Sequence, residues 1–364
     1  MKLAGFRLYR YRLPLTGPLQ LKGTTLRHRE GLLVELNGDG EAAGWGEAAP
    51  LHGFSREGTG EVAAQLSRLA SAMMDRAITA DLLDPYGPLA RELDEMGLAP
   101  SARFGFELAL WSLHAASAGE TLPELLTARP RETVSINALM SSPDHALEEA
   151  RLARLSGYEA VKLKVGSRGV EEDVEFVRAV HEALGDAVEL RLDANRAWSV
   201  AEAEEFARAT AGLDLEYVEE PLADPAWLPS FVRDHRLPVA LDESLVLLEP
   251  EDLEEHGYAR AVVLKPTLLG GISRTLRFAR IASRLGLRPV ISSAYETGVG
   301  TSALVALAAG LGEAPAGLDT YRRLADDILR PRLELTAPRV DVRAFFGRRR
   351  EVDGRLLVPV GSMG

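Results

Sequence analysis

Charged residues recur at regular intervals in the second half of the chain, each near the end of a short apolar run. In chain order they are Lys162, Lys164, Asp193, Glu219, Asp242 and Lys265. After Lys164 the successive spacings are 29, 26, 23 and 23 residues, which suits one strand and one helix per step. Buried strands are almost wholly apolar, so an ionisable group at the end of each one requires a chemical reason.

The three acids in this series indicate a metal site. Carboxylates that met without a cation would repel one another and take up protons. Ligation by oxygen alone, with no cysteine in the chain and no histidine at a strand end, favours a hard ion. We therefore predict that Asp193, Glu219 and Asp242 hold Mg²⁺, with Mn²⁺ as the alternative.

The lysines indicate acid–base chemistry beside that metal. Lys162 and Lys164 are two residues apart, so on a strand they share one face. Two ammonium groups side by side near a metal should lower the pKa of at least one of them, which makes it a base near neutral pH. Lys265 lies four units further along and is expected to face them from the opposite side of a closed sheet.

Further polar residues near these runs are predicted to support the site. Asn195 shares a strand face with Asp193 and is expected to hydrogen-bond behind the metal ligands. Ser292 and Ser293 end a later run and are expected to donate to a substrate carboxylate. Glu220 and Glu243 should point to the other face of their strands, where structural roles fit better than metal ligation.

The elements that must position these residues form a repeating pattern. Segments with helical periodicity separate eight β-rich runs, which begin near residues 133, 159, 188, 215, 238, 261, 288 and 316. Strands that alternate with helices predict a parallel sheet, and eight units predict closure into a modified (β/α) TIM-type barrel of the α/β class over residues 126–325. The charged series then falls at the carboxyl ends of the strands, the face where such barrels carry their active sites.

The first third of the chain has a different pattern. Strands are predicted at 2–15 and 27–36, a turn at 37–40, and a short strand that ends in Gly44-Trp45-Gly46-Glu47. Helices are predicted at about 57–78 and 100–118. We interpret residues 1–125 as an α+β capping domain and residues 326–364 as a C-terminal segment that returns to it.

Composition excludes several classes of function. Of the 364 residues, 46% are hydrophobic and 26% charged, and no apolar run approaches the roughly 20 residues of a membrane span. A net charge of −12 argues against a nucleic-acid surface. The absence of cysteine fits a reduced compartment, so we expect a cytoplasmic enzyme with a small-molecule substrate and no membrane partner. Nothing in the sequence indicates an oligomeric state.

Together the motifs resemble the enolase superfamily, and more narrowly its muconate-lactonizing-enzyme subgroup. The matching pieces are Lys162-Leu163-Lys164, Leu192-Asp193-Ala194-Asn195, Glu219-Glu220-Pro221, Asp242-Glu243-Ser244 and Leu264-Lys265-Pro266. Within the subgroup the chain looks most like the o-succinylbenzoate synthase family. That likeness rests on the run Arg191–Trp198, Ile291-Ser292-Ser293, Gly317-Leu318-Asp319-Thr320, and Gly44–Glu47 followed by Pro50–Ser55. One segment departs from the family, because Ala294-Tyr295-Glu296-Thr297 stands where a more Ser-rich segment is expected.

The resemblance implies a lyase that removes water from a cyclohexadiene carboxylate in menaquinone biosynthesis. It implies that Lys164 takes the proton α to the carboxylate, that Lys162 tunes it, and that Lys265 lies across the ring. Arg191 is carried over as a substrate or supporting contact. Lys22 and Arg27, expected in a loop between the first two strands, are predicted to reach the succinyl carboxylate.

Three other reactions on the same scaffold stay open: racemisation of an N-acylamino acid, epimerisation of a dipeptide and cycloisomerisation of a muconate. A dipeptide epimerase would usually show an Asp-x-Asp motif near the eighth run, whereas this chain has only Glu296 and Asp319. A barrel that only binds or assembles would have no reason to keep both lysines and all three acids.

Overall fold

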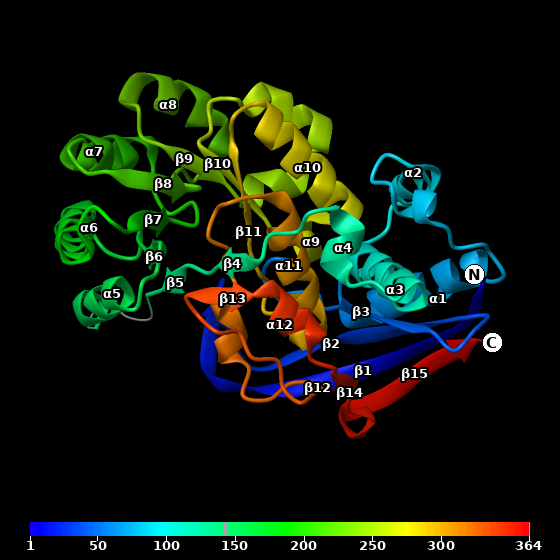
Figure 1. The fold of residues 1–364 in the computed structure, drawn as a ribbon. Coiled ribbons are helices and arrows are strands. Elements are labelled where there is room, and N and C mark those ends of the chain that lie inside the picture. Colours follow the sequence, from blue (N-terminus) through cyan, green and yellow to red (C-terminus); the bar gives the residue numbers. More distant parts are fainter. Residues whose placement is uncertain (141–144, 364) are drawn as a thin grey trace.

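A barrel of parallel strands and a separate antiparallel sheet make up the structure, a computed structural model that describes residues 1–140 and 145–363 (Figure 1). Helices α5, α6, α7 and α8 lie outside the barrel strands, and both chain termini lie at the antiparallel sheet, away from those helices (Figure 1). No helix in the described part of the chain is both long and apolar enough to cross a membrane.

The antiparallel sheet has the strand order β15-β1-β2-β3. Its strands are β1 (Leu3–Leu21), β2 (Thr24–Gly38), β3 (Ala43–Ala48) and β15 (Leu357–Met363). Strands β1 and β2 form a longer hairpin than the sequence predicts, closed by Lys22 and Gly23 with φ of 40° and 82°. Two positive φ angles suit the two-residue turns that match strand twist. Lys22 is therefore at a hairpin tip, and Arg27 belongs to β2 rather than to a loop.

Helices cover one face of this sheet, and α3 approaches β3 unusually closely. Helices α1 (Thr59–Met73) and α3 (Pro100–Ala118) contact the strands of the sheet. Of the two other helices in this part, α2 (Pro88–Glu95) mainly contacts the 3₁₀ helix at Ala80–Leu83, and α4 (Leu122–Leu126) contacts α3 and the later helix at Gly298–Leu311. A Cβ atom at Gly46 would lie 1.8 Å from the Gly105 carbonyl oxygen, and one at Gly44 would lie 2.2 Å from that of Ala109. The glycines on either side of Trp45 therefore allow the helix backbone to rest on the strand.

The barrel strands follow one another in chain order, and every neighbouring pair is parallel. They are β5 (Ala138–Leu139), β6 (Ala160–Lys164), β7 (Glu189–Asp193), β8 (Leu215–Glu219), β9 (Val239–Leu241), β10 (Ala261–Leu264) and β11 (Arg288–Ile291). The helices between and after them are α5 (Ala146–Leu155), α6 (Val170–Leu184), α7 (Val200–Thr210), α8 (Leu228–His235), α9 (Pro266–Leu269), α10 (Ile272–Arg284) and α11 (Gly298–Leu311). The step from β9 to β10 uses the 3₁₀ helices η3 (Glu243–Leu247) and η4 (Pro250–His256) instead of an α-helix.

The eighth predicted run closes the barrel without forming a strand. Gly317 bridges Ser292 and Ala316 bridges Ile136, each as an isolated parallel bridge. The 3₁₀ helix η5 (Asp319–Arg323) starts two residues after Gly317, so the chain turns away before a ladder can form. The first predicted run is also divided, because β4 (Thr133–Ser135) pairs with β13 (Arg339–Asp341) and only β5 joins the barrel.

The C-terminal segment returns to both parts of the fold. Strand β12 (Leu329–Arg330) pairs with β14 (Glu351–Val352), α12 (Val342–Gly347) lies between β13 and β14, and β15 pairs with β1. Domain boundaries at residues 125 and 325 stay a prediction.

Candidate active site

The charged series meets at the carboxyl ends of neighbouring strands. Asp193 and Glu219 are the last residues of β7 and β8, while Asp242 and Lys265 directly follow β9 and β10. The register pairs Lys164 with Asp193 and Asp193 with Glu219. The structure thus brings the residues of this series to the same end of neighbouring strands.

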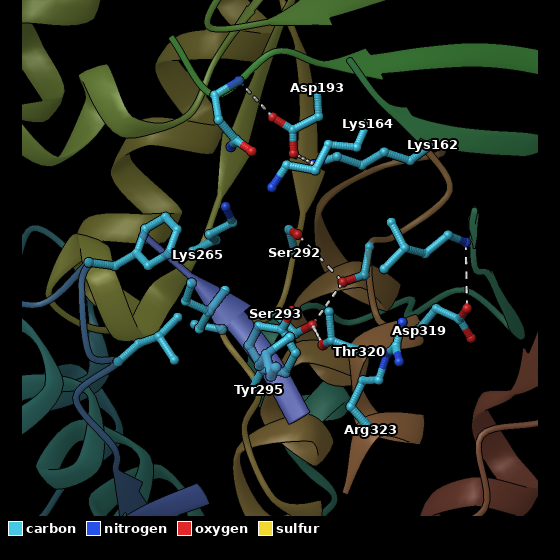
Figure 2. Close-up of a pocket in the computed structure, with 18 of the residues that line it drawn as sticks. Lys162, Lys164, Asp193, Lys265, Ser292, Ser293, Tyr295, Asp319, Thr320 and Arg323 are labelled. Carbon is cyan, nitrogen blue, oxygen red and sulfur yellow. Dashed lines mark hydrogen bonds and ion pairs between the residues drawn. The ribbon is translucent and has the colours of Figure 1, made fainter. Parts of the chain in front are cut away.

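Ion pairs link the lysines to the acids. The Lys162 ammonium lies 2.8 Å from Asp193 Oδ2 and 2.6 Å from Glu219 Oε2. The Lys265 ammonium pairs with Asp242 Oδ2. Figure 2 shows Lys265 on one side of the pocket and Lys162 with Lys164 on the other. Each of the three carboxylates thus has a lysine partner.

Burial and charge set the pKa values of these groups. Burial, together with the charges of Asp193 and Asp242, raises the pKa of Glu219 to about 8, even though Lys162 works against it. Burial works to lower the pKa of Lys162, but the carboxylates of Asp193, Glu219 and Asp242 outweigh it and raise that pKa well above its usual value. The expected lowering of a lysine pKa is therefore not found at Lys162.

Lys164 differs from its neighbour. Its side chain is exposed to the pocket, and within the described residues it makes no hydrogen bond or ion pair. Lys162 and Lys265 retain only 15% of their side-chain exposure and are held by acids. Among the three lysines, Lys164 is the one whose amine is free to meet a substrate.

The donor set fits a hard divalent cation. Three carboxylates converge here, and the side-chain oxygens Asn195 Oδ1 and Glu243 Oε2 are buried nearby without a hydrogen-bond partner. As the side chains stand, no three Asp, Glu, His or Cys residues of the described chain are grouped closely enough to hold a metal. The three carboxylates are instead paired with lysines, Asp193 and Glu219 with Lys162 and Asp242 with Lys265, and a cation bound there would replace these ion pairs.

A cavity of about 320 Å³ opens over these residues. Its floor is the end of the barrel, and its roof comes from the hairpin and loop of the antiparallel sheet. The roof residues are Leu19, Gln20, Leu21, Leu51 and Phe54. The lining is apolar on the cap side and charged on the barrel side, as expected for a pocket that orients a small polar ligand.

Comparisons with known proteins place the chain in a family. A family model described as "Enolase C-terminal domain-like" matches residues 145–348, more than half of the chain. The chain belongs to the enolase superfamily. A second model, described as "MenC, N-terminal domain", matches residues 3–113.

Curated relatives and solved structures agree with this membership. The o-succinylbenzoate synthase of Yersinia enterocolitica is 35% identical over 342 residues, which are 92% of this chain and 96% of the relative. "Protein PHYLLO, chloroplastic" of Arabidopsis thaliana is 33% identical, but this chain spans only 20% of its length. The muconate lactonizing enzyme of Pseudomonas fluorescens has the same fold, with a TM-score of 0.82, 22% identity and 98% of each chain covered.

Glu220 lies behind the charged series, where the alternation of side chains along a strand predicts it to have a structural role. Its Oε1 accepts hydrogen bonds from the backbone N–H groups of Asp242 (3.0 Å) and Ser244 (2.7 Å). Its Oε2 accepts from Ser244 Oγ (2.9 Å) and Arg196 Nε (3.0 Å). This buried carboxylate therefore fixes the backbone of Asp242.

Asn195 lies beside the acids, in agreement with its expected supporting place. Its backbone N–H donates to Asp193 Oδ1 at 3.2 Å, and its Nδ2 donates to Glu243 Oε1 at 3.4 Å. Burial and the charges of Asp242, Asp193 and Glu220 raise the pKa of Glu243. Asn195 also lines the cavity, so it links the acids to the ligand space.

Ser292 and Ser293 line the cavity but serve the barrel closure. Ser293 Oγ donates to the Gly317 carbonyl at 3.0 Å and is hydrogen-bonded to Thr320 Oγ1, while Ser292 Oγ lies 3.4 Å from the same carbonyl. When these bonds are made, the hydroxyl protons of Ser293 and Thr320 are both used. Ser293, which the sequence predicts to be a donor to a substrate carboxylate, then offers the cavity an acceptor instead.

Arg191 is not a substrate contact. It is fully buried inside the barrel, where its guanidinium pairs with Glu216 and donates to the Pro315 carbonyl at 2.6 Å. Its Nη1 also lies 3.4 Å from Asn137 Oδ1, and Asn137 lines the cavity. Arg191 thus lies beneath the cavity, inside the barrel, and contacts its wall through Asn137.

Lys22 and Arg27 lie outside the cavity lining. The Lys22 ammonium is 4.1 Å from the centroid of the Phe54 ring, and Phe54 does line the cavity. Arg27 is exposed on β2. Neither cation is therefore among the residues that line this pocket, although the neighbouring Leu21 is.

Sequence reasoning missed several lining residues. These are Asn137, Tyr295, Asp319, Thr320 and Arg323. Their position just after the closing bridges was a usable signal, since loops at the carboxyl ends of barrel strands form the active site. The spacing alone, however, does not indicate which of the neighbouring residues Arg322 and Arg323 faces the cavity.

Two buried side chains join the cap to the barrel near the pocket. Glu47 accepts from the Thr297 and Gly300 N–H groups at the start of α11, and from Tyr11 Oη at 2.6 Å. Arg29 Nε donates to the Tyr295 carbonyl at 2.9 Å. The pocket wall at Tyr295 is therefore held from the cap side.

Proposed function

We propose that the protein is an o-succinylbenzoate synthase that acts in the cytoplasm in menaquinone biosynthesis. It would remove water from 2-succinyl-6-hydroxy-2,4-cyclohexadiene-1-carboxylate to give 2-succinylbenzoate. The observation that carries the proposal is the cavity in which Lys164 and Lys265 come from opposite strands over one group of carboxylates. The 35% identity to a curated synthase over almost the whole chain supports the same substrate.

Asp193, Glu219 and Asp242 are the residues that would hold the cation, Mg²⁺ in the first place and Mn²⁺ as the alternative. Bound there, the metal supplies positive charge that stabilises the negative charge developing on the substrate carboxylate. Glu220 keeps the backbone of Asp242 in position, and Asn195 donates hydrogen bonds to both Asp193 and Glu243.

The proton transfers are assigned to Lys164. Its free amine removes the proton α to the ring carboxylate, which generates an enediolate. The resulting ammonium then donates that proton to the departing hydroxyl, which leaves as water while the ring becomes aromatic. Lys265, held by Asp242 on the other side of the pocket, presents a cation to the ring and its developing charge.

Epimerisation of dipeptides fits the pocket less well. A dipeptide carries an ammonium group that requires acidic partners, and the acids near the eighth run are Glu296 and Asp319. Glu296 is buried and is used by Thr267 Oγ1 and the Ala294 N–H. Only Asp319 lines the cavity, where Arg322 already pairs with it at 2.9 Å.

The test is ultraviolet absorbance of the purified protein mixed with the hydroxycyclohexadiene carboxylate, with and without Mg²⁺. Rapid metal-dependent loss of the diene band would support the synthase. An unchanged spectrum with metal demonstrably bound would refute it. Deuterium exchange at the α-carbon of N-acylamino acids and dipeptides would then test the racemase and epimerase reactions.

A further inference from the structure

Within the described residues, the cavity has one cationic lining residue that neither takes part in the proposed proton transfers nor pairs with an acid. Its charged lining residues are Lys162, Lys164, Lys265, Arg323, Asp193 and Asp319. Lys162 and Lys265 are paired with acids of the site, and Asp319 is paired with Arg322. Within the described residues, Arg323 makes no hydrogen bond or ion pair, although its side chain is half-buried.

Arg323 lies at the end of the cavity away from the metal-site acids. Figure 2 places it below Thr320 and Asp319, with Asp193 and Lys164 at the other end of the view. The pocket is thus an elongated space with a base and carboxylates at one end and an unpaired guanidinium at the other. A planar guanidinium is the side chain best suited to bind a carboxylate with two hydrogen bonds.

Other groups at this end do not replace that charge. Ser293 donates its hydroxyl proton to the Gly317 carbonyl, and Thr320 then donates its own to Ser293 Oγ. Asn137 donates from Nδ2 to the Ala138 carbonyl at 3.3 Å. The Tyr295 hydroxyl makes no hydrogen bond within the described residues, but it is a neutral donor, and Lys22 and Arg27 do not line the cavity.

The substrate of the proposed function is a dicarboxylate whose second carboxylate ends the succinyl chain, and this step rests on that proposed function. We propose that Arg323 binds the succinyl carboxylate and so selects substrates that carry a second anionic group at that distance from the ring. Arg323 is a specificity-determining residue in this role; it takes no part in the proton transfers.

Direct binding tests the proposal with two ligands that differ only at that group. One is 2-succinylbenzoate, and the other is 2-butanoylbenzoate, in which a methyl group replaces the carboxylate. Calorimetric titration of the Mg²⁺-loaded wild-type protein should show about 10- to 100-fold tighter binding of 2-succinylbenzoate, the range expected for a hydrogen-bonded charge pair. Arg323→Met should lose that preference and bind both ligands equally, whereas Arg323→Lys should keep part of it.

A charge-matched control is Arg343→Met, because Arg343 is exposed on α12, outside the cavity. It should retain the wild-type preference. In turnover, Arg323→Met should raise KM for the diene by about the same factor as it weakens product binding, while kcat changes by less than about fivefold.

The outcomes separate this inference from the proposed function. Turnover of the diene together with an unchanged ligand preference in Arg323→Met would overturn the role of Arg323 and leave the synthase standing. Equal binding of both ligands by the wild type would overturn it as well. A wild-type protein that neither binds 2-succinylbenzoate nor consumes the diene would refute both proposals.

Discussion

The substitution Glu220→Gln should reveal how much the carboxylate behind the site contributes to the free energy of unfolding and to Mg²⁺ affinity. Four donors surround this buried side chain. A glutamine can keep its oxygen toward the two backbone N–H groups, and its amide nitrogen can donate to Ser244 Oγ if that hydroxyl rotates. The nitrogen then faces Arg196 Nε donor to donor, so one charge-assisted hydrogen bond is lost and Arg196 loses its counter-charge.

A hydrogen bond to a charged group contributes about 1.5–3 kcal/mol, and Arg196 is 26% exposed and can rehydrate in part. We therefore expect the free energy of unfolding to fall by about 2–3 kcal/mol, measured by urea denaturation in EDTA. Because Glu220 fixes the backbone of Asp242, Mg²⁺ affinity should also fall by about 10- to 100-fold, measured by calorimetry.

The matched control is Glu30→Gln, which breaks the exposed pair with Arg12 and should cost less than about 1 kcal/mol. A loss for Glu220→Gln no larger than that of the control, with Mg²⁺ affinity unchanged, would refute the reasoning.

Three further predictions concern the base, the metal and acid stability. Lys164→Ala should reduce turnover at least about 10³-fold in the diene assay and leave urea stability within about 0.5 kcal/mol, because the side chain is exposed and unpaired. EDTA should abolish turnover and Mg²⁺ restore it, and Mg²⁺ should raise the unfolding midpoint in a thermal scan. Burial works to raise the pKa of Asp94, but Arg103 and Arg277 hold it below 3.8. The ion pairs of Asp94 should therefore stabilise the fold at neutral pH, and this stabilisation should be lost as Asp94 becomes protonated in acid. Asp94→Asn should lower the free energy of unfolding, measured in urea, by about 1–2 kcal/mol at pH 7 and leave it unchanged in strong acid.

The strand-end series could be predicted because a buried strand tolerates a charge only where the chain reaches the barrel mouth. Asp193, Glu219 and Lys265 stand out against apolar runs for that reason, and the regular spacing orders them around the barrel. Arg191 lies two residues before Asp193, so the alternation of side chains along a strand places both on the same face. A rise of about 3.3 Å per residue nevertheless places it roughly 7 Å deeper, where it can only serve the interior.

Other positions depend on turns that composition does not specify. Lys22-Gly23 lacks the Asn-Gly signature of a tight hairpin, so the hairpin was expected to end earlier and its cations to face the pocket. At the eighth run, the 3₁₀ helix after Gly317 decides that Arg323 lines the cavity while Arg322 turns to Asp319. Such a choice between adjacent arginines depends on local backbone direction, which residue type and spacing do not encode.

The arrangement of the cap explains why this charge-rich site is also a pocket. Leu19, Leu21 and Phe54 cover the barrel mouth with apolar surface, which limits the access of water to the ion pairs of Lys162 and Lys265 below and strengthens them. That cover depends on Glu47 and Arg29, whose bonds to α11 and to the Tyr295 carbonyl fix the cap against the barrel. Since Tyr295 and Arg323 both line the pocket, the contacts that hold the cap also shape the end of the cavity where we place the succinyl carboxylate.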